Sequence, residues 1–282
     1  MPCMSPKWSR SRCIARVMRP ESLIVPGFES LSPWLLAYIA LVIAVAGWVQ
    51  GALGLGFPMI ATPLIAAATN MQVAVVMVLI PCVAAVLVNI LRSRGVVDIL
   101  RRFWWMPFVA LIGAVIGARL FVLYPEFPYA LLLAGVILFY LNLDRLGLAQ
   151  WPLMRRHEKA FGLGFGLLGG ISESTANIAA PPLIIYYLGI GLSPLALVPA
   201  MNISFLVGKI TQFATLTASG IATPTIWLMT LPLAVLATIA SLLGGRVRSR
   251  IDGATYGRWM RRMLFAMAMI LLLQVGYRYA MT

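Results

Sequence analysis

The sequence predicts an all-α polytopic membrane protein made of two inverted-topology repeats. Of its 282 residues, 61% are hydrophobic and 11% are charged, whereas an ordinary soluble domain has about 45–50% and about 25%. The apolar residues form long runs, and basic residues collect between these runs and give a formal net charge of +14. A basic nucleic-acid-binding protein is polar overall, so a mean hydropathy of +0.94 argues against nucleic acid as a partner.

About ten membrane segments follow one another along the chain. A spanning helix needs about 20 apolar residues, and seven of the runs approach that length, 128–143 only marginally. The runs 57–69, 160–171 and 181–192 are shorter, and at about 1.5 Å per residue each would cross about half of the hydrocarbon core. We expect half-helices there. The ten runs are 33–49, 57–69, 71–91, 103–122, 128–143, 160–171, 181–192, 194–216, 224–243 and 263–280.

Residues 1–32 differ from the rest because basic residues stand among Ser and Pro without an apolar core. This is not the pattern of a secretory signal peptide. We expect a basic, poorly ordered extension, with an anchor to the lipid surface as the alternative. The first transmembrane repeat then takes 33–143, a basic cytoplasmic linker takes 144–159 and the second repeat takes 160–282.

The two halves of the chain resemble each other at an offset of about 119 residues. The stretch Gly51–Ile65 matches Gly170–Ile184, since both begin with glycine and close with Pro-Leu-Ile. Further matches of 79–81 with 197–199 and of 117–120 with 244–247 follow in the same order. Matches in a constant order across the chain predict a duplication, which is common in transporters.

The charges of equivalent loops predict that the repeats are inverted. The loop 92–102 carries four arginines and its counterpart 217–223 carries no charge, whereas 123–127 has a single Glu and its counterpart 244–262 has six arginines. The positive-inside rule therefore puts equivalent loops on opposite sides of the membrane.

The same rule predicts the path of the short segments. With 144–159 and 244–262 cytoplasmic and two crossings between them, 160–192 must return to its own side as a hairpin of two half-helices broken near 170–180. Because 33–69 is the equivalent segment of the first repeat, we expect it to form a hairpin as well. This path puts both termini on the non-cytoplasmic side of the membrane.

Both Gly/Pro-rich breaks are candidates for the functional centre, because a backbone break inside a membrane needs protein or water to satisfy it. The second half-helix of each hairpin is expected to begin at mid-depth, near Pro58 and near Pro181. Each helix start offers free N–H groups and about +0.5 of a charge, so two starts would balance a monovalent anion. The alternative is that glycines only permit close helix packing. The candidate substrate-binding residues are Gly51, Gly54, Gly56, Pro58, Pro63, Ser172, Glu173, Ser174, Asn177, Pro181, Pro182, Asn202 and Lys209.

The polar residues of the second half add donors and charges. Ser172, Ser174 and Asn177 are ligands for an anion or caps for a helix start. Glu173 is the one acid that we place at membrane depth, where an ionised carboxylate costs free energy. Three interpretations of this residue are open: it couples a proton to the substrate, it pairs with Lys209, or it caps a helix end that faces water. For Lys209 the interpretations are that it attracts the anion, that it neutralises Glu173, or that its long side chain extends to the membrane–water interface. Asn202, seven residues earlier, lies on the same helical face as Lys209.

Metal, redox and catalytic chemistry have little support in the sequence. The three cysteines form no CxxC pair, and His157 is the single histidine, in the basic linker. We therefore expect neither a cofactor nor a metal, and we do not expect an enzyme. The alternatives are an intramembrane enzyme that uses Glu173 and Lys209 as an acid/base pair, and a scaffold that transports nothing.

Several motifs in order resemble the TauE/SafE family of sulfite exporters over 33–280. The motifs are Gly51-x-x-Gly-x-Gly leading to Pro63-Leu, Gly95-Val-Val-Asp98, Gly113-x-x-x-Gly117-x-Arg119, and Ala179–Leu188 followed by Gly191-Leu-Ser-Pro194. The second break departs from the family, which is often glycine-rich where this chain has Ser172–Asn177.

The resemblance implies a multi-pass permease of the bacterial inner membrane with two inverted halves. It would move sulfite, sulfonates or related organic anions along a path that the two Gly/Pro motifs line. The expected partners are a small anion and the lipid bilayer, without nucleic acid, and a homodimer stays open.

Overall fold

The computed structural model describes residues 32–93, 95–123, 152–176 and 180–248, with isolated positions between 131 and 142 and between 255 and 276. Every regular element within these ranges is an α-helix. The extension 1–31 and most of the runs 128–143 and 263–280 lie outside the described residues, as do Asn177 and Ala179. The expectations for those segments therefore stay predictions.

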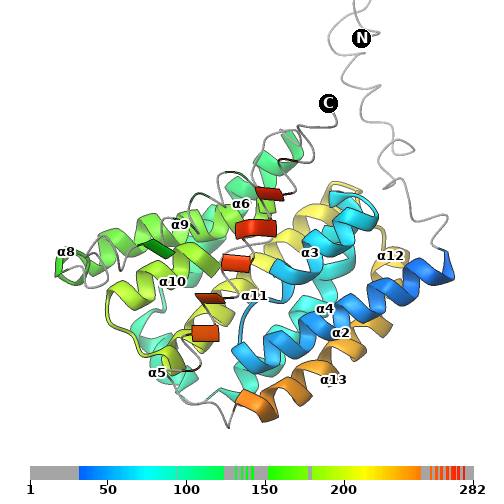
Figure 1. Cartoon of the computed structure of the whole chain (residues 1–282). Helices are drawn as coiled ribbons and strands as arrows, with labels where there is room; N and C mark the ends of the chain where they lie inside the picture. The colour runs from blue at the N-terminus through cyan, green and yellow to red at the C-terminus, as the bar shows by residue number, and fades with distance from the viewer. Residues whose placement is uncertain are drawn as a thin grey trace, which may run out of the picture.

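The described helices divide between the two halves of the chain (Figure 1). The first half contains α2 (Pro33–Leu53), α3 (Phe57–Ala68), α4 (Met71–Arg92), α5 (Val96–Arg102) and α6 (Met106–Leu123). The second half contains α8 (Pro152–Arg156), α9 (Glu158–Ala176), α10 (Ala180–Gly189), α11 (Pro194–Ala218), α12 (Pro224–Met229) and α13 (Leu231–Arg248).

Local sequence sets the starts of the long helices. Ser32 accepts a hydrogen bond from Leu35 N at 3.3 Å before α2, and Asn70 accepts one from Val73 N at 2.9 Å before α4. Ser193 caps α11 in the same way, and proline occupies the first turn of both α2 and α11. These residues satisfy donors that a helix start leaves open.

The helices suit a membrane in both length and surface. Within the described part of the chain, four helices are long and apolar enough to cross: Pro33–Leu53, Gln72–Arg92, Ala196–Ala218 and Pro224–Arg248. The pair α5 and α6, bent by 74°, passes the same test as a fifth. Large apolar side chains such as Trp34 and Leu91 are more than 80% exposed, which fits a lipid-facing surface. The chain is a multi-pass membrane protein.

The structure corrects the prediction of a half-helix at 160–171. Helix α9 has 19 residues, which is about 28 Å, and it runs through Ser172, Glu173 and Ser174 instead of breaking there. These polar residues are compatible with a helix; the neighbouring Thr175 Oγ1, for example, donates to the backbone oxygen of Ile171, one turn earlier, at 2.8 Å. Helix α2 is likewise 21 residues long, so within the two hairpins only α3 and α10 are short.

Helix boundaries recur between the two halves at an offset of 123 residues. Helices α2 and α9 end at 53 and 176, α3 and α10 begin at 57 and 180, and α4 and α11 begin at 71 and 194. The ends of α6 and α13, at 123 and 248, differ by 125. This recurrence supports a duplication but corrects the offset of about 119, so that Gln50 corresponds to Glu173 and Asn89 to Gln212.

The two halves exchange helices in space. Helix α2 packs against α13, and its counterpart α9 packs against α6, so each four-helix group mixes the halves. One group contains α2, α3, α4 and α13, and the other contains α6, α9, α10 and α11 (Figure 1). Helices α4 and α11 contact each other where the groups meet.

Glycines let these helix pairs approach closely. A Cβ on Gly51 would overlap Ser241 O of α13, and one on Gly170 would overlap Ala110 O of α6. Backbones approach closely at small residues in membrane proteins. For Gly51 the packing interpretation is therefore confirmed, since this residue lies inside α2 and not in the break.

Basic residues from three parts of the chain meet at one end of the molecule. Arg102 Nη2 pairs with Glu158 Oε2 at 3.3 Å, and Arg92 Nη1 donates to Leu242 O at 3.4 Å. Arg155 lies against Gly191 in the loop between α10 and α11. We call this the basic end; it joins the loop after α4, the region of α8 and the end of α13.

Candidate functional site

The break between α2 and α3 is formed by two glycines with left-handed backbone. Gly54 has φ 76° and donates its N–H to Gln50 O at 2.7 Å, closing α2, and Gly56 has φ 108° at the start of α3. Glycine adopts such angles at no steric cost. Pro58 lies in the first turn of α3, as predicted. The whole break is buried.

Three side chains, which we call the amide cluster, surround this break: Gln50, Asn89 and Asn202. Gln50 Oε1 accepts from Phe57 N at 2.9 Å, and Gln50 Nε2 donates to Asn202 Oδ1 at 3.0 Å. Asn202 Nδ2 donates to Gly54 O at 2.7 Å, and Asn89 Nδ2 donates to Gln50 O at 2.9 Å. The cluster supplies the partners that broken backbone needs inside a membrane.

The amide cluster changes the expectation for the start of α3. The sequence prediction assumed free N–H groups there, but the Phe57 N–H is already bonded to Gln50 and Pro58 has no N–H. One of the N–H groups that this helix start could offer an anion is therefore already satisfied within the protein.

A second polar group, the charged cluster, lies between α9 and α11 and contains Glu173, Ser174, Lys209 and Gln212. Lys209 Nζ lies 2.7 Å from Glu173 Oε1, and the two side chains are 0% and 2% exposed. Lys209 Nζ also donates to Gln212 Oε1 at 3.2 Å, and Gln212 Nε2 donates to Ser174 O at 3.5 Å. The predicted pairing of Glu173 with Lys209 is confirmed, and the interpretations of Lys209 reaching the interface and of Glu173 as a water-facing cap are wrong.

The fold makes room for the carboxylate. A Cβ on Gly208 would lie 2.8 Å from Glu173 Cγ, so the neighbour of Lys209 must be small. Removing both charges from water costs several kcal/mol per ion, and such pairs seldom add net stability. An ionisable pair at membrane depth is therefore a candidate for function.

A buried hydroxyl accompanies the ion pair. Ser174 is 2% exposed, and its Oγ has no hydrogen-bond partner among the described residues. Ser172 is also buried, one turn from Thr175 on the same helix. An unpaired buried hydroxyl is a donor that a ligand can use.

The two clusters are separated along α11. Asn202 and Lys209 are seven residues apart, which is about 10 Å along a helix, and they belong to different clusters. The two clusters therefore lie at different levels along α11. Pro63 is buried inside α3, and Pro181 and Pro182 are buried in the first turn of α10.

Sequence reasoning missed Gln50, Asn89 and Gln212. A neutral amide within an apolar run carries neither a charge nor a motif that would mark it as functional. The signal that could have found these residues is the offset of 123 residues, which aligns Gln50 with Glu173 and Asn89 with Gln212. Two positions of the charged cluster, Glu173 and Gln212, thus align with two positions of the amide cluster, whereas Lys209 aligns with Val86.

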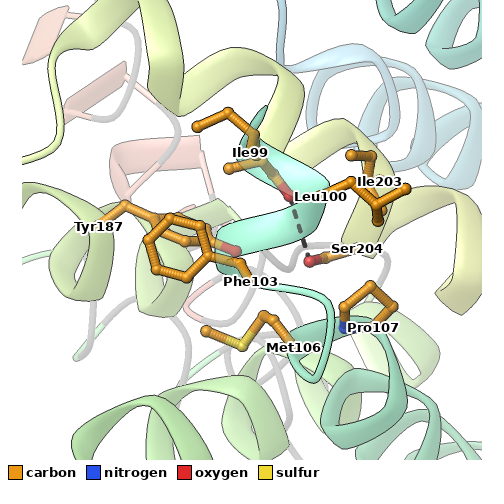
Figure 2. Close-up of a pocket in the computed structure, with 9 residues that line it drawn as sticks. Ile99, Leu100, Phe103, Met106, Pro107, Tyr187, Ile203 and Ser204 are labelled. Atoms are coloured by element: carbon orange, nitrogen blue, oxygen red, sulfur yellow. Dashed lines mark hydrogen bonds between the residues drawn. The ribbon is translucent and has the colours of Figure 1, made fainter. Parts of the chain in front are cut away.

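A small cavity lies between α5, the start of α6, α10 and α11, and none of the cluster residues lines it. Figure 2 shows it between Tyr187 and Phe103 on one side and Ser204 on the other, with the bond from Ser204 Oγ to Ala200 O at 3.3 Å dashed. Its volume of about 10 Å³ holds about one water molecule. An anion the size of sulfite does not fit there in this conformation.

Comparison with known proteins identifies the family of this chain. The model of the family described as Sulfite exporter TauE/SafE matches residues 39–275. The chain belongs to this family. The match includes both clusters and both helix breaks. No curated protein and no solved structure matches the chain.

Membership in TauE/SafE sets the general function. The proteins of this family are membrane transporters of the sulfite exporter type and not enzymes. For this TauE/SafE protein, membership supports a small anionic substrate and a lipid environment, and neither the intramembrane enzyme nor the inert scaffold gains support.

Proposed function

We propose that this TauE/SafE protein is a permease for a small organic or sulfur-containing anion of the sulfite or sulfonate type, which binds between two inverted repeats. The observation that carries the proposal is the fully buried Lys209, paired with Glu173; Lys209 lies on α11, which is long and apolar enough to cross a membrane. Among the described residues, Lys209 is the one buried cation.

The charged cluster offers the chemistry that such an anion needs. An ammonium group is a compact charge with three donors, and the hydroxyls of Ser172 and Ser174 lie on the helix that faces it. These groups would replace water around the oxygens of a sulfonate. In the conformation described, the cluster is closed to solvent, so binding requires the helices around it, including α9 and α11, to move apart.

A flux experiment tests this function. Purified protein in liposomes is loaded with unlabelled anion, and uptake of labelled sulfite, sulfate, sulfoacetate and simple carboxylates is followed against liposomes without protein. We expect saturable counterflow of one or more sulfur oxyanions, because a carrier exchanges substrate through one site. A folded protein that exchanges none of these oxyanions would contradict the proposal.

The orientation of the repeats leads to a separate prediction. We propose that the basic end faces the cytoplasm of a bacterial inner membrane, because basic loops stay inside. With Cys3 and Cys13 replaced by serine, Thr223→Cys at the opposite end of α11 should react with a membrane-impermeant maleimide in intact cells. Arg156→Cys should react only after the cells are permeabilised.

Both labelling positions are exposed, so labelling reports which side of the membrane they face and not burial. Cys82 is buried and is kept in both variants, where the parent protein without either new cysteine gives the background labelling. Labelling of Arg156→Cys in intact cells would reject the cytoplasmic assignment of the basic end.

A further inference from the structure

We propose that the Glu173–Lys209 pair couples anion movement to protons: an anion binds Lys209 when Glu173 is protonated, and one proton crosses with each monovalent anion. This inference rests on the proposed permease function. It assigns the coupling ion and the residue that carries it.

The contact geometry makes the two ligands of Lys209 competitors. The ammonium lies 2.7 Å from Glu173 Oε1 and donates to Gln212 at 3.2 Å, and all three side chains are buried. An anion that reaches Lys209 must share the ammonium with the carboxylate or displace it.

Charge balance decides between these outcomes. The existing pair is neutral as a unit, so a monovalent anion beside it would leave a net negative charge in a region without solvent. A proton on a Glu173 carboxylate oxygen restores neutrality and turns that group from an acceptor into a donor for the anion. When the anion leaves on the other side, Glu173 releases the proton to water and pairs with Lys209 again.

No other charged group in the described part of the chain replaces Lys209 as the partner of Glu173. Helix α6, which packs against α9, carries Arg119 on its exposed surface, and the arginines of α8 are exposed at the basic end. On α4, the buried thiol of Cys82 lies within electrostatic range of both charges. On α10, Tyr187 makes an edge-to-face contact with Phe103, and Tyr186 lies beside Gly162, well before Glu173 along α9.

In the first half of the chain, the position that aligns with Glu173 is occupied by an uncharged residue, Gln50. Gln50, equivalent to Glu173, bonds the start of α3 and Asn202 with a neutral amide. A glutamine is therefore compatible with this place in the helical hairpin, which makes Glu173→Gln the substitution of choice for removing the proton site.

The experiment uses the full chain in liposomes with methanesulfonate, a monovalent probe whose own charge is constant between pH 5 and pH 8. With the outside one pH unit more acidic, the unsubstituted protein should accumulate the probe about tenfold, as one proton per anion requires, and the lumen should acidify. Glu173→Gln should give no accumulation and no acidification, and the exchange of labelled for unlabelled probe that it retains without a gradient should not depend on pH. Glu158→Gln, at the surface end of the same helix, should behave like the unsubstituted protein.

Each other result has a definite meaning. Accumulation that ignores the pH gradient, or that survives in Glu173→Gln, overturns the coupling and leaves the permease function intact. Absence of exchange of methanesulfonate and every oxyanion by the folded, unsubstituted protein overturns the permease function itself. If Glu173→Gln loses exchange as well, Glu173→Asp decides, since restored pH-driven accumulation supports coupling and its absence refutes it.

Discussion

Replacing Lys209 by methionine together with Glu173→Gln is expected to lower anion exchange by about 10- to 100-fold, because a hydrogen bond to a charged group contributes about 1.5–3 kcal/mol. The double substitution is used because Lys209→Met alone would leave the buried carboxylate of Glu173 without its counter-charge, which destabilises a protein by about 3–5 kcal/mol. The double variant keeps both side-chain volumes and removes both charges. Exchange at zero pH gradient, at equal amounts of reconstituted protein, is the measurement.

Two comparisons isolate the role of the cation. Lys159→Met removes an exposed lysine from the start of α9 and should leave exchange unchanged. Glu173→Gln alone keeps Lys209 and should exchange the anion faster than the double variant does. Normal exchange in the double variant, with its folding verified by gel filtration, would show that the anion does not depend on Lys209.

Replacing Gly170 by valine is expected to lower the Tm in detergent by about 6–12 °C, or to prevent recovery of folded protein. A side chain on Gly170 would overlap the backbone of α6 at Ala110, and its Cβ would lie 2.7 Å from Ala114 N. Backbone cannot move aside as a side chain can, so the cost is at the upper end of the usual 1–3 kcal/mol for overpacking. Thermal unfolding followed by gel filtration measures the effect.

Gly164→Val, on the same helix, is the matched control. Gly164 is exposed and a Cβ there has nothing within 4 Å. Both substitutions change helix propensity equally, so the difference between them reports the contact of α9 with α6. Equal Tm values for the two variants would refute the close packing of α9 on α6.

Much of the fold follows from local sequence. Long apolar runs predicted α2, α4 and α11, and capping residues such as Asn70 account for where helices begin. The prediction was wrong for α9, because a cluster of Ser, Thr and Glu is typical of a break. Whether such residues break a helix depends on the partners that other helices bring, which hydropathy does not record.

The candidate site was predictable only in part. Pairing of Glu173 with Lys209 was among the sequence-based alternatives, since each is the obvious counter-charge for the other. The anion-binding roles of the breaks stay proposals. The charged cluster offers a buried cation, whereas the first N–H group of α3 is already bonded to Gln50. Gln50 was missed because a neutral amide in an apolar run has no local signature.

Composition, charge placement and motif order were sufficient to recognise a membrane transporter of the TauE/SafE family, since these properties act on neighbouring residues and on transfer into lipid. The helix exchange between halves, the amide cluster and the closed ion pair emerge only in three dimensions. Gln50 and Asn202 are 152 positions apart, and Gly170 packs on a helix of the other half of the chain. Buried polar groups take whichever partners the packed helices bring within hydrogen-bonding distance, and that choice depends on the whole bundle at once.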